Sequence, residues 1–128
     1  MATPVDEYRE KPQRVRVLFA LGTTSDFYSL EDSSIPEVME ACKQAFNDLE
    51  TKFGVHVLGT LDDDETMVGP SAGWPWTCYI LADAPDREAV AGVCNQLRTT
   101  KVGESGQRLW RYLQVEARLG RSLFFAES

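Results

Sequence analysis

Hydrophobic and polar positions along the chain follow two different periods. Apolar residues recur at every second position in four segments, as they do in half-buried β-strands. These segments are Arg14–Gly22, Val55–Leu61, Trp76–Ala82 and Leu109–Ala117. In Ser34–Phe53 and Asp86–Leu97, apolar residues instead stand three and four positions apart, as on one side of an amphipathic helix. The chain therefore reads as strand, helix, strand, followed by strand, helix, strand.

This β-α-β-β-α-β order predicts the fold class. It is α+β and ferredoxin-like, with a four-stranded antiparallel sheet and two helices on one of its faces. We expect a single domain over residues 1–128, with residues 1–13 as a polar N-terminal tail. In the first strand Val15, Val17, Phe19 and Leu21 form the apolar side, which should lie beneath the helices. The other face of the sheet is predicted to stay uncovered.

The first helical segment has marked ends. Ser34 and Glu37 form a capping-box pattern, and Pro36 suits the first turn of a helix. Gly54 is predicted to end the helix in the left-handed conformation. The segment Ser34–Phe53 is therefore expected to be one helix. Asp83 or Asp86 should cap the second.

Residues of mixed chemistry are predicted on the uncovered face. In the last strand the residues Trp110, Tyr112, Gln114, Glu116 and Arg118 alternate with an apolar set. Arg16 and His56 fit the same face, and so does Trp76, although in its strand Thr77, Tyr79 and Leu81 also form a plausible core set. Burying such side chains against a dry partner would be costly unless they were paired, so an aqueous cavity is expected there.

Composition and charge exclude several classes of partner. The net charge of −7 disfavours nucleic acid and anionic membrane surfaces, since both would repel the chain. No apolar run approaches the length of a membrane span, and residues 1–13 lack the apolar core of a signal peptide. Cys42, Cys78 and Cys94 are widely spaced at apolar positions, which suits free thiols in a reducing compartment. We therefore expect a cytoplasmic protein.

The charge is unevenly distributed. Arg98–Arg121 holds six bases and two acids, and this basic segment could meet an acidic surface of a second subunit, attract a small anion, or form a solvated face. Asp62–Glu65 lacks the spacing of a calcium loop and is expected to be a solvated turn. The cysteines are too scattered for zinc. No metal or other cofactor is expected.

Three residues are candidates for a catalytic role, and His56 and Glu116 among them would transfer protons. His56 is the only histidine, and histidine titrates near neutral pH without perturbation. Glu116 in an apolar barrel would act as a base, with Tyr112 beside it to hold a substrate oxygen. The plainer interpretations are a strand histidine satisfied by a neighbour and, for Glu116, an ion pair at a dimer interface.

Four further residues are candidates for substrate binding. Arg16 would pair with a substrate carboxylate, or would lie at a wet strand end. Trp76 and Trp110 would stack on a planar aromatic ring, and Tyr28 would cover the pocket from a long polar loop. The same aromatic residues would equally suit a homodimer interface.

The pattern resembles the dimeric α/β-barrel superfamily, in which two ferredoxin-like sheets pack face to face around a pocket. Within it, the strand Trp74–Trp76 and the helix end Asn95–Arg98 look like the darcynin-type small proteins. Phe53–Val55 and Leu58–Thr60 are similar to small proteins of bacterial indole-3-acetate degradation clusters. The superfamily includes cofactor-independent monooxygenases, haem-degrading enzymes and isomerases, so membership implies a fold and no single reaction.

The resemblance implies a homodimer that binds a planar aromatic small molecule. The first hypothesis is an enzyme of aromatic catabolism, for example of indole-acetate type, that performs a cofactor-independent oxygenation or a proton-transfer isomerisation. The alternative is a non-catalytic dimeric binding or assembly module. A third hypothesis is haem binding through His56, although the haem-binding relatives usually offer a histidine on a helix or loop.

Overall fold

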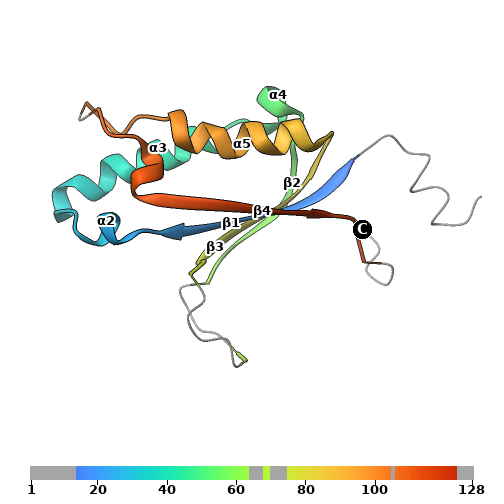
Figure 1. Cartoon of the computed structure of the whole chain (residues 1–128), viewed down its shortest axis with the longest axis horizontal. Coiled ribbons are helices and arrows are strands. Elements are labelled where there is room, and N and C mark those ends of the chain that lie inside the picture. The colour runs from blue at the N-terminus through green and yellow to red at the C-terminus, as the bar shows by residue number, and fades with distance from the viewer. Residues whose placement is uncertain (1–13, 64–67, 70–74, 105, 124–128) are drawn as a thin grey trace, which may run out of the picture.

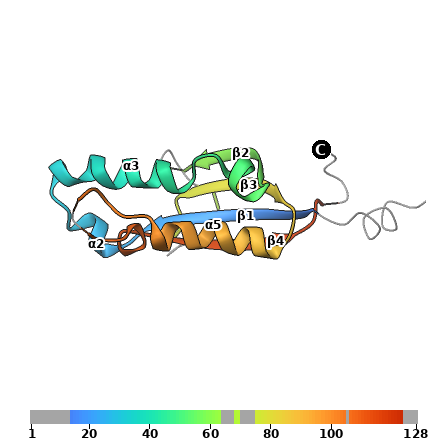
Figure 2. The same ribbon diagram turned by 90° about the horizontal axis from the view of Figure 1, so that it is seen from above.

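The computed structural model describes residues 14–63, 68–69, 75–104 and 106–123. Its four strands form one antiparallel sheet in the order β2-β3-β1-β4, and the helices lie on one face of it (Figures 1 and 2). The strands are β1 (Val15–Thr23), β2 (His56–Asp62), β3 (Cys78–Ala84) and β4 (Leu113–Gly120). The predicted α+β, ferredoxin-like fold is confirmed.

Four α-helices and two short 3₁₀ helices connect the strands. The α-helices are α2 (Ser25–Tyr28), α3 (Ile35–Ala45), α4 (Leu49–Phe53) and α5 (Arg87–Thr99). The 3₁₀ helices are η1 (Asp32–Ser34) and η2 (Leu109–Arg111). The predictions for residues 1–13, Asp64, Glu65 and Trp74 lie outside the described residues.

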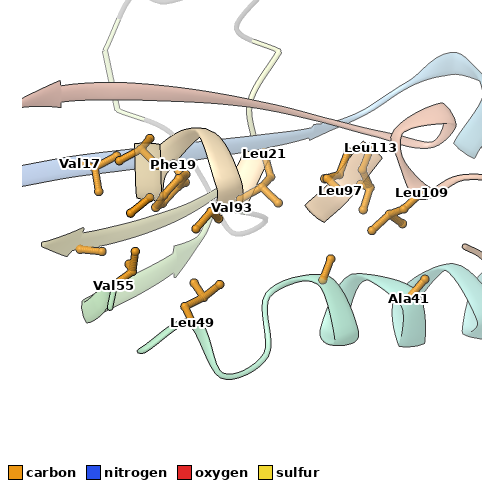
Figure 3. Packing of buried hydrophobic residues seen from close by; sticks show 14 of the residues in the cluster. Val17, Phe19, Leu21, Ala41, Leu49, Val55, Val93, Leu97, Leu109 and Leu113 are labelled. Carbon is orange, nitrogen blue, oxygen red and sulfur yellow. The ribbon is translucent and has the colours of Figure 1, made fainter. Parts of the chain in front are cut away.

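The core lies between the sheet and the helices, and Figure 3 shows its packing. Val17 and Phe19 of β1 are fully buried there, as the period of two predicted. Val93 and Leu97 of α5 close over them from the helical side. Burial of these aliphatic and aromatic side chains is the main favourable contribution to the stability of the fold.

The predicted helix Ser34–Phe53 is interrupted in the structure. It divides into α3 and α4, and Asp48 between them has a left-handed backbone, with a φ of 56°. The break turns the chain so that Leu49 reaches the core with 3% of its surface exposed. The capping-box prediction is wrong, because Ser34 belongs to η1 and its side chain makes no capping hydrogen bond. Gly54 ends α4 in the left-handed conformation, as predicted.

The start of α5 is capped by Asp86. The Ala89 backbone N–H donates to the Asp86 carboxylate at 2.8 Å, which satisfies one of the free donors at the helix start. Of the two caps considered from the sequence, Asp86 is therefore the one used. Asp83 instead lies within β3.

The last strand begins later than its sequence pattern predicts. Leu109–Arg111 form the 3₁₀ helix η2, and the strand itself starts at Leu113. In a 3₁₀ turn, residues three positions apart share a side, so Leu109 and Tyr112 both point into the core. This change of period overturns the predicted position of Tyr112 on the uncovered face.

Candidate functional site

The face of the sheet that no helix covers is called the open face. Its residues on the two central strands are Arg16, Leu18 and Ala20 of β1 and Tyr79, Leu81 and Asp83 of β3, which lie in register. On the edge strands it continues through His56, Gly59 and Leu61 of β2 and Gln114, Glu116 and Arg118 of β4. In Figure 1 this face lies opposite α3 and α5.

A shallow apolar groove of about 610 Å³ runs over β2, β3 and β1 on the open face. Its walls are Leu18, Gly59, Thr60, Leu61, Asp63, Val68, Tyr79 and Leu81. Leu61 is 58% exposed and Leu81 is 38% exposed, because the strand register places both side chains on the open face. Contiguous exposed apolar surface of this kind marks binding or interaction sites on soluble proteins.

Ion pairs flank the groove. The Arg16 Nε donates to the Asp83 carboxylate at 2.6 Å across β1 and β3, and both side chains are mostly shielded from solvent. On β4 the Arg118 guanidinium lies 3.0 Å from the Glu116 carboxylate. Two arginines and two carboxylates on the four strands therefore leave this face nearly neutral, with Asp63 at its edge as one further acid.

Tyr79 lines the groove next to the β2–β3 connection, and Trp76 lies beside Tyr79. The Tyr79 hydroxyl lies 3.0 Å from the Asp63 carboxylate and 3.2 Å from the Trp76 carbonyl oxygen. A Cβ at Gly22 would lie 3.4 Å from the Trp76 ring and only 2.3 Å from the Pro75 carbonyl oxygen. The absence of a side chain at Gly22 therefore lets the 75–76 segment and the indole lie directly on the sheet.

Tyr79 and Leu81 are residues that sequence reasoning did not place at the site. The core set Thr77, Tyr79 and Leu81 considered for this strand is wrong, because Cys78, Ile80 and Ala82 face the helices. Both sets alternate correctly, so periodicity could not distinguish them. Side-chain size was a usable signal for choosing between the two sets. The small side chains of Ala82 and Ala84 fit beneath helices that already place large side chains in the core.

The predicted acid–base residues do not meet within one protomer. His56 is on edge strand β2 and Glu116 is on the opposite edge strand β4, with β3 and β1 between them. The His56 side chain is 54% exposed, and its Nδ1 lies 3.8 Å from the Glu50 carboxylate of α4. Tyr112 is in the core with 7% of its surface exposed.

The predicted substrate-binding residues divide between the two ends of the sheet. Arg16 lies at the end where β1 begins, paired with Asp83. Tyr28, Trp76 and Trp110 lie at the other end, where β1 finishes and β4 starts. The Tyr28 hydroxyl accepts a hydrogen bond from the Thr23 hydroxyl at 2.6 Å, and the Trp110 side chain is 57% exposed in η2.

A second cavity, of about 640 Å³, separates α3 from the β2–β3 edge and contains Cys42 and Cys78. Burial raises the pKa of the Cys42 thiol, and the neighbouring Cys78 raises it further. Burial also raises the pKa of Cys78 and of Cys94. These thiols are therefore protonated and weakly nucleophilic at neutral pH. All three are free in the structure.

Comparison with known proteins gives structural neighbours only. No family model matches the chain, and no curated protein matches it. One neighbour is a solved structure described as chlorite dismutase-like, with 23% identity and a TM-score of 0.47 over 89% of this chain. The chain corresponds to 46% of that structure's length. Another is a dimeric protein of unknown function and ferredoxin-like fold from Bacteroides fragilis, with 12% identity, a TM-score of 0.38, and coverage of 83% of this chain and 91% of that one.

The part of the chain that the structure describes contains neither a membrane-spanning helix nor a cluster of metal ligands. None of the described helices has the length and apolar character needed to cross a membrane. Among the described residues, no three histidine, cysteine or carboxylate side chains are grouped so that they could hold a metal ion.

Proposed function

We propose that the protein is a homodimeric small-molecule-binding module whose ligand lies in the open-face groove. The observation that carries the proposal is the apolar groove of about 610 Å³ on a sheet face that none of the described helices covers. A single protomer leaves this groove shallow and wet. A second copy packed on the open face would give it a second wall and exclude water from it.

Two features of the open face favour a second copy over an unrelated partner. First, all seven residues of β2 are exposed, and Val57, Leu58 and Leu61 are among them, so this strand lacks cover on both sides. Second, the open face is nearly neutral in a chain of net charge −7. A two-fold interface brings the same surface of both copies together, and a nearly neutral surface avoids repulsion there.

The chemistry of the groove favours a flat, largely apolar ligand. Leu18 and Leu81 offer aliphatic surface, and Tyr79 offers an aromatic ring. The hydroxyl of Tyr79 and the carboxylate of Asp63, 3.0 Å apart, provide a polar edge that would orient the ligand. A planar aromatic compound meets these requirements, in agreement with the ligand class expected from the sequence.

Binding is the better supported function, and a catalytic step in aromatic catabolism would need a further condition. His56 and Glu116 would have to come from different copies to act on one substrate, because one protomer holds them on opposite edge strands. Within the protomer, each faces an oppositely charged or polar neighbour: Glu50 for His56 and Arg118 for Glu116. The described lining of the groove includes no histidine, lysine, serine or cysteine side chain.

Light scattering coupled to size-exclusion chromatography, together with titration by the neutral planar dye N-phenyl-1-naphthylamine, tests the proposal. The wild type should elute as a dimer and enhance the dye's fluorescence. Leu81→Arg should be a folded monomer with at least tenfold weaker dye binding, because a charge would be buried in the groove. Met39→Arg is the matched control, since Met39 is 52% exposed on α3, on the helical side. A wild type that is monomeric at 100 µM would overturn the proposal.

A further inference from the structure

A third cavity lies at the end of the sheet, away from the open-face groove. It measures about 460 Å³ and lies between the start of α2 and the 3₁₀ helix η2, which Figure 2 shows side by side. Its lining residues are Thr24, Asp26, Gly106, Gln107, Arg108, Trp110 and Arg111. It shares none of them with the open-face groove. The two sites are therefore structurally separate.

Hydrogen bonds fix the two walls of this cavity to each other. The Thr24 hydroxyl donates to the Arg111 carbonyl oxygen at 2.7 Å, and the Thr24 backbone N–H donates to the Tyr112 carbonyl oxygen at 2.9 Å. The Arg111 Nε lies 3.4 Å from the Asp26 carboxylate. These contacts join segments more than 80 positions apart in the sequence, so the cavity is preformed.

The outward position of Trp110 follows from the geometry of η2. Leu109 and Tyr112, three positions apart, are both buried in the core and anchor the turn. Trp110 and Arg111 between them are directed outward, and Trp110 is 57% exposed. An exposed indole in a wall of a cavity offers a flat surface on which an aromatic ring can stack.

The cavity is positively charged in an acidic protein. Of its two arginines, Arg111 is neutralised by Asp26 and also lies 5.7 Å from the centre of the Tyr112 ring. Arg108 forms no ion pair with any described residue. One guanidinium is thus available to an anion, and a guanidinium binds a carboxylate through two parallel hydrogen bonds.

We propose that this cavity binds a small aromatic carboxylate. The Arg108 guanidinium pairs with the carboxylate, and the Trp110 indole stacks on the ring. Binding is non-covalent and no bond is made or broken. The proposal is independent of the open-face groove, because the residues of the two sites differ.

Isothermal titration calorimetry with 2-naphthoate and the neutral 2-naphthamide tests this proposal. The wild type should bind naphthoate at least tenfold more tightly than the amide. Arg108→Gln should remove that preference, and Trp110→Ala should weaken both ligands by threefold or more. Lys52→Gln is the control for loss of one positive charge, since Lys52 lies on α4, outside this cavity. Neither Arg108→Gln nor Trp110→Ala removes a core side chain, so both should fold.

Three results would overturn the inference, and the third concerns Leu81→Arg. The first is no naphthoate binding to the wild type at millimolar concentration, and the second is equal affinity in Arg108→Gln and Lys52→Gln. Leu81→Arg separates this site from the proposed function, because it should weaken binding of the neutral dye at least tenfold and leave naphthoate affinity within twofold of the wild type. Loss of naphthoate binding in Leu81→Arg would place the carboxylate in the open-face groove instead.

Discussion

Asp48 adopts a backbone conformation that suits glycine better than aspartate. Its φ of 56° and ψ of 43° are left-handed, and a Cβ in this region crowds the following carbonyl group. Asparagine and aspartate tolerate the conformation better than other residues, and Asn47-Asp48 supplies both at the break between α3 and α4. The strain is local, and the exposed Asp48 side chain makes none of the capping hydrogen bonds of α4.

Replacing Asp48 by glycine should therefore leave the fold unchanged and raise the free energy of unfolding by up to about 1 kcal/mol, because glycine enters the left-handed region without steric cost. Urea denaturation followed by circular dichroism measures the change. Glu40→Gly, at an exposed position within α3, is the control and should destabilise by about 1 kcal/mol. Equal losses in both variants would contradict the strain argument.

The thiol of Cys42 links stability to alkaline pH. Burial raises its folded-state pKa above the ordinary value of 9.0. In the unfolded chain the thiol ionises near that ordinary value, while in the folded protein it keeps its proton to a higher pH. Ionisation therefore stabilises the unfolded state first. The contribution of Cys42 to the free energy of unfolding is complete below about pH 9, and it is lost as the pH rises towards the folded-state pKa.

We expect the free energy of unfolding to fall more steeply between pH 8.5 and 10 in the wild type than in Cys42→Ser, which has no thiol to ionise. The two curves should run parallel between pH 6 and 8, where the thiol is protonated in both states. Denaturation in a reducing buffer at each pH gives the slopes. Identical slopes above pH 9 would show that Cys42 is as well solvated in the folded as in the unfolded state.

At the scale of the element, strand β1 packs closely against other parts of the chain on both of its sides. Its helical side packs Val17 and Phe19 into the core. On its other side, Gly22 touches the 75–76 segment, so closely that any side chain there would meet backbone atoms. Gly59 of β2 differs, because nothing lies within 4 Å of the position its Cβ would take.

These two glycines give a matched pair of variants. Gly22→Ala should destabilise by about 1–3 kcal/mol, because the Cβ would lie 2.3 Å from a carbonyl oxygen that is part of the backbone. Gly59→Ala should be neutral or stabilise by up to about 1 kcal/mol, through the lower entropy of the unfolded chain. Thermal unfolding of both variants measures the difference. A loss at Gly59 as large as at Gly22 would mean that steric contact is not the cause.

The elements that the sequence predicted well are those with one dominant period. The alternation of β1 and the stripe of α5, with Asp86 as its cap, matched the structure. The errors occurred where the period changes inside an apolar segment. The break at Asp48 divides the predicted helix into α3 and α4, and the 3₁₀ turn before Leu113 turns Tyr112 into the core. Short apolar runs cannot show such changes.

The candidate site was predictable only in part, for a related reason. Strand pattern placed Arg16, Glu116 and Arg118 on the uncovered face, where the structure has them. Their lateral distances depend on strand order, and that order separates His56 from Glu116. Trp110 and Tyr28 lie at one end of the sheet in η2 and α2, two elements that strand periodicity did not indicate.

At the scale of the whole molecule, the distribution of charge distinguishes the faces. The chain carries a net charge of −7, yet the strands present Arg16 and Arg118 beside Asp83 and Glu116 on the open face. If two copies pack these faces together, each charge on one copy is repeated on the other. The balance between the signs then determines whether the contact is attractive.

Glu116→Arg should therefore weaken the dimer. It would leave three arginines and one carboxylate on the four strands of each open face, so that the two faces would repel. We expect the dimer dissociation constant to rise at least tenfold in 50 mM salt and to recover partly in 500 mM salt, because salt screens exposed charges. Analytical ultracentrifugation at both salt concentrations measures this.

Glu40→Arg on the helical side makes the same change of charge and should leave the dimer dissociation constant within threefold of the wild type, because α3 lies away from the open face. If both variants weaken the dimer equally, net charge and not the open face controls association, and the two-fold contact must lie elsewhere on the molecule.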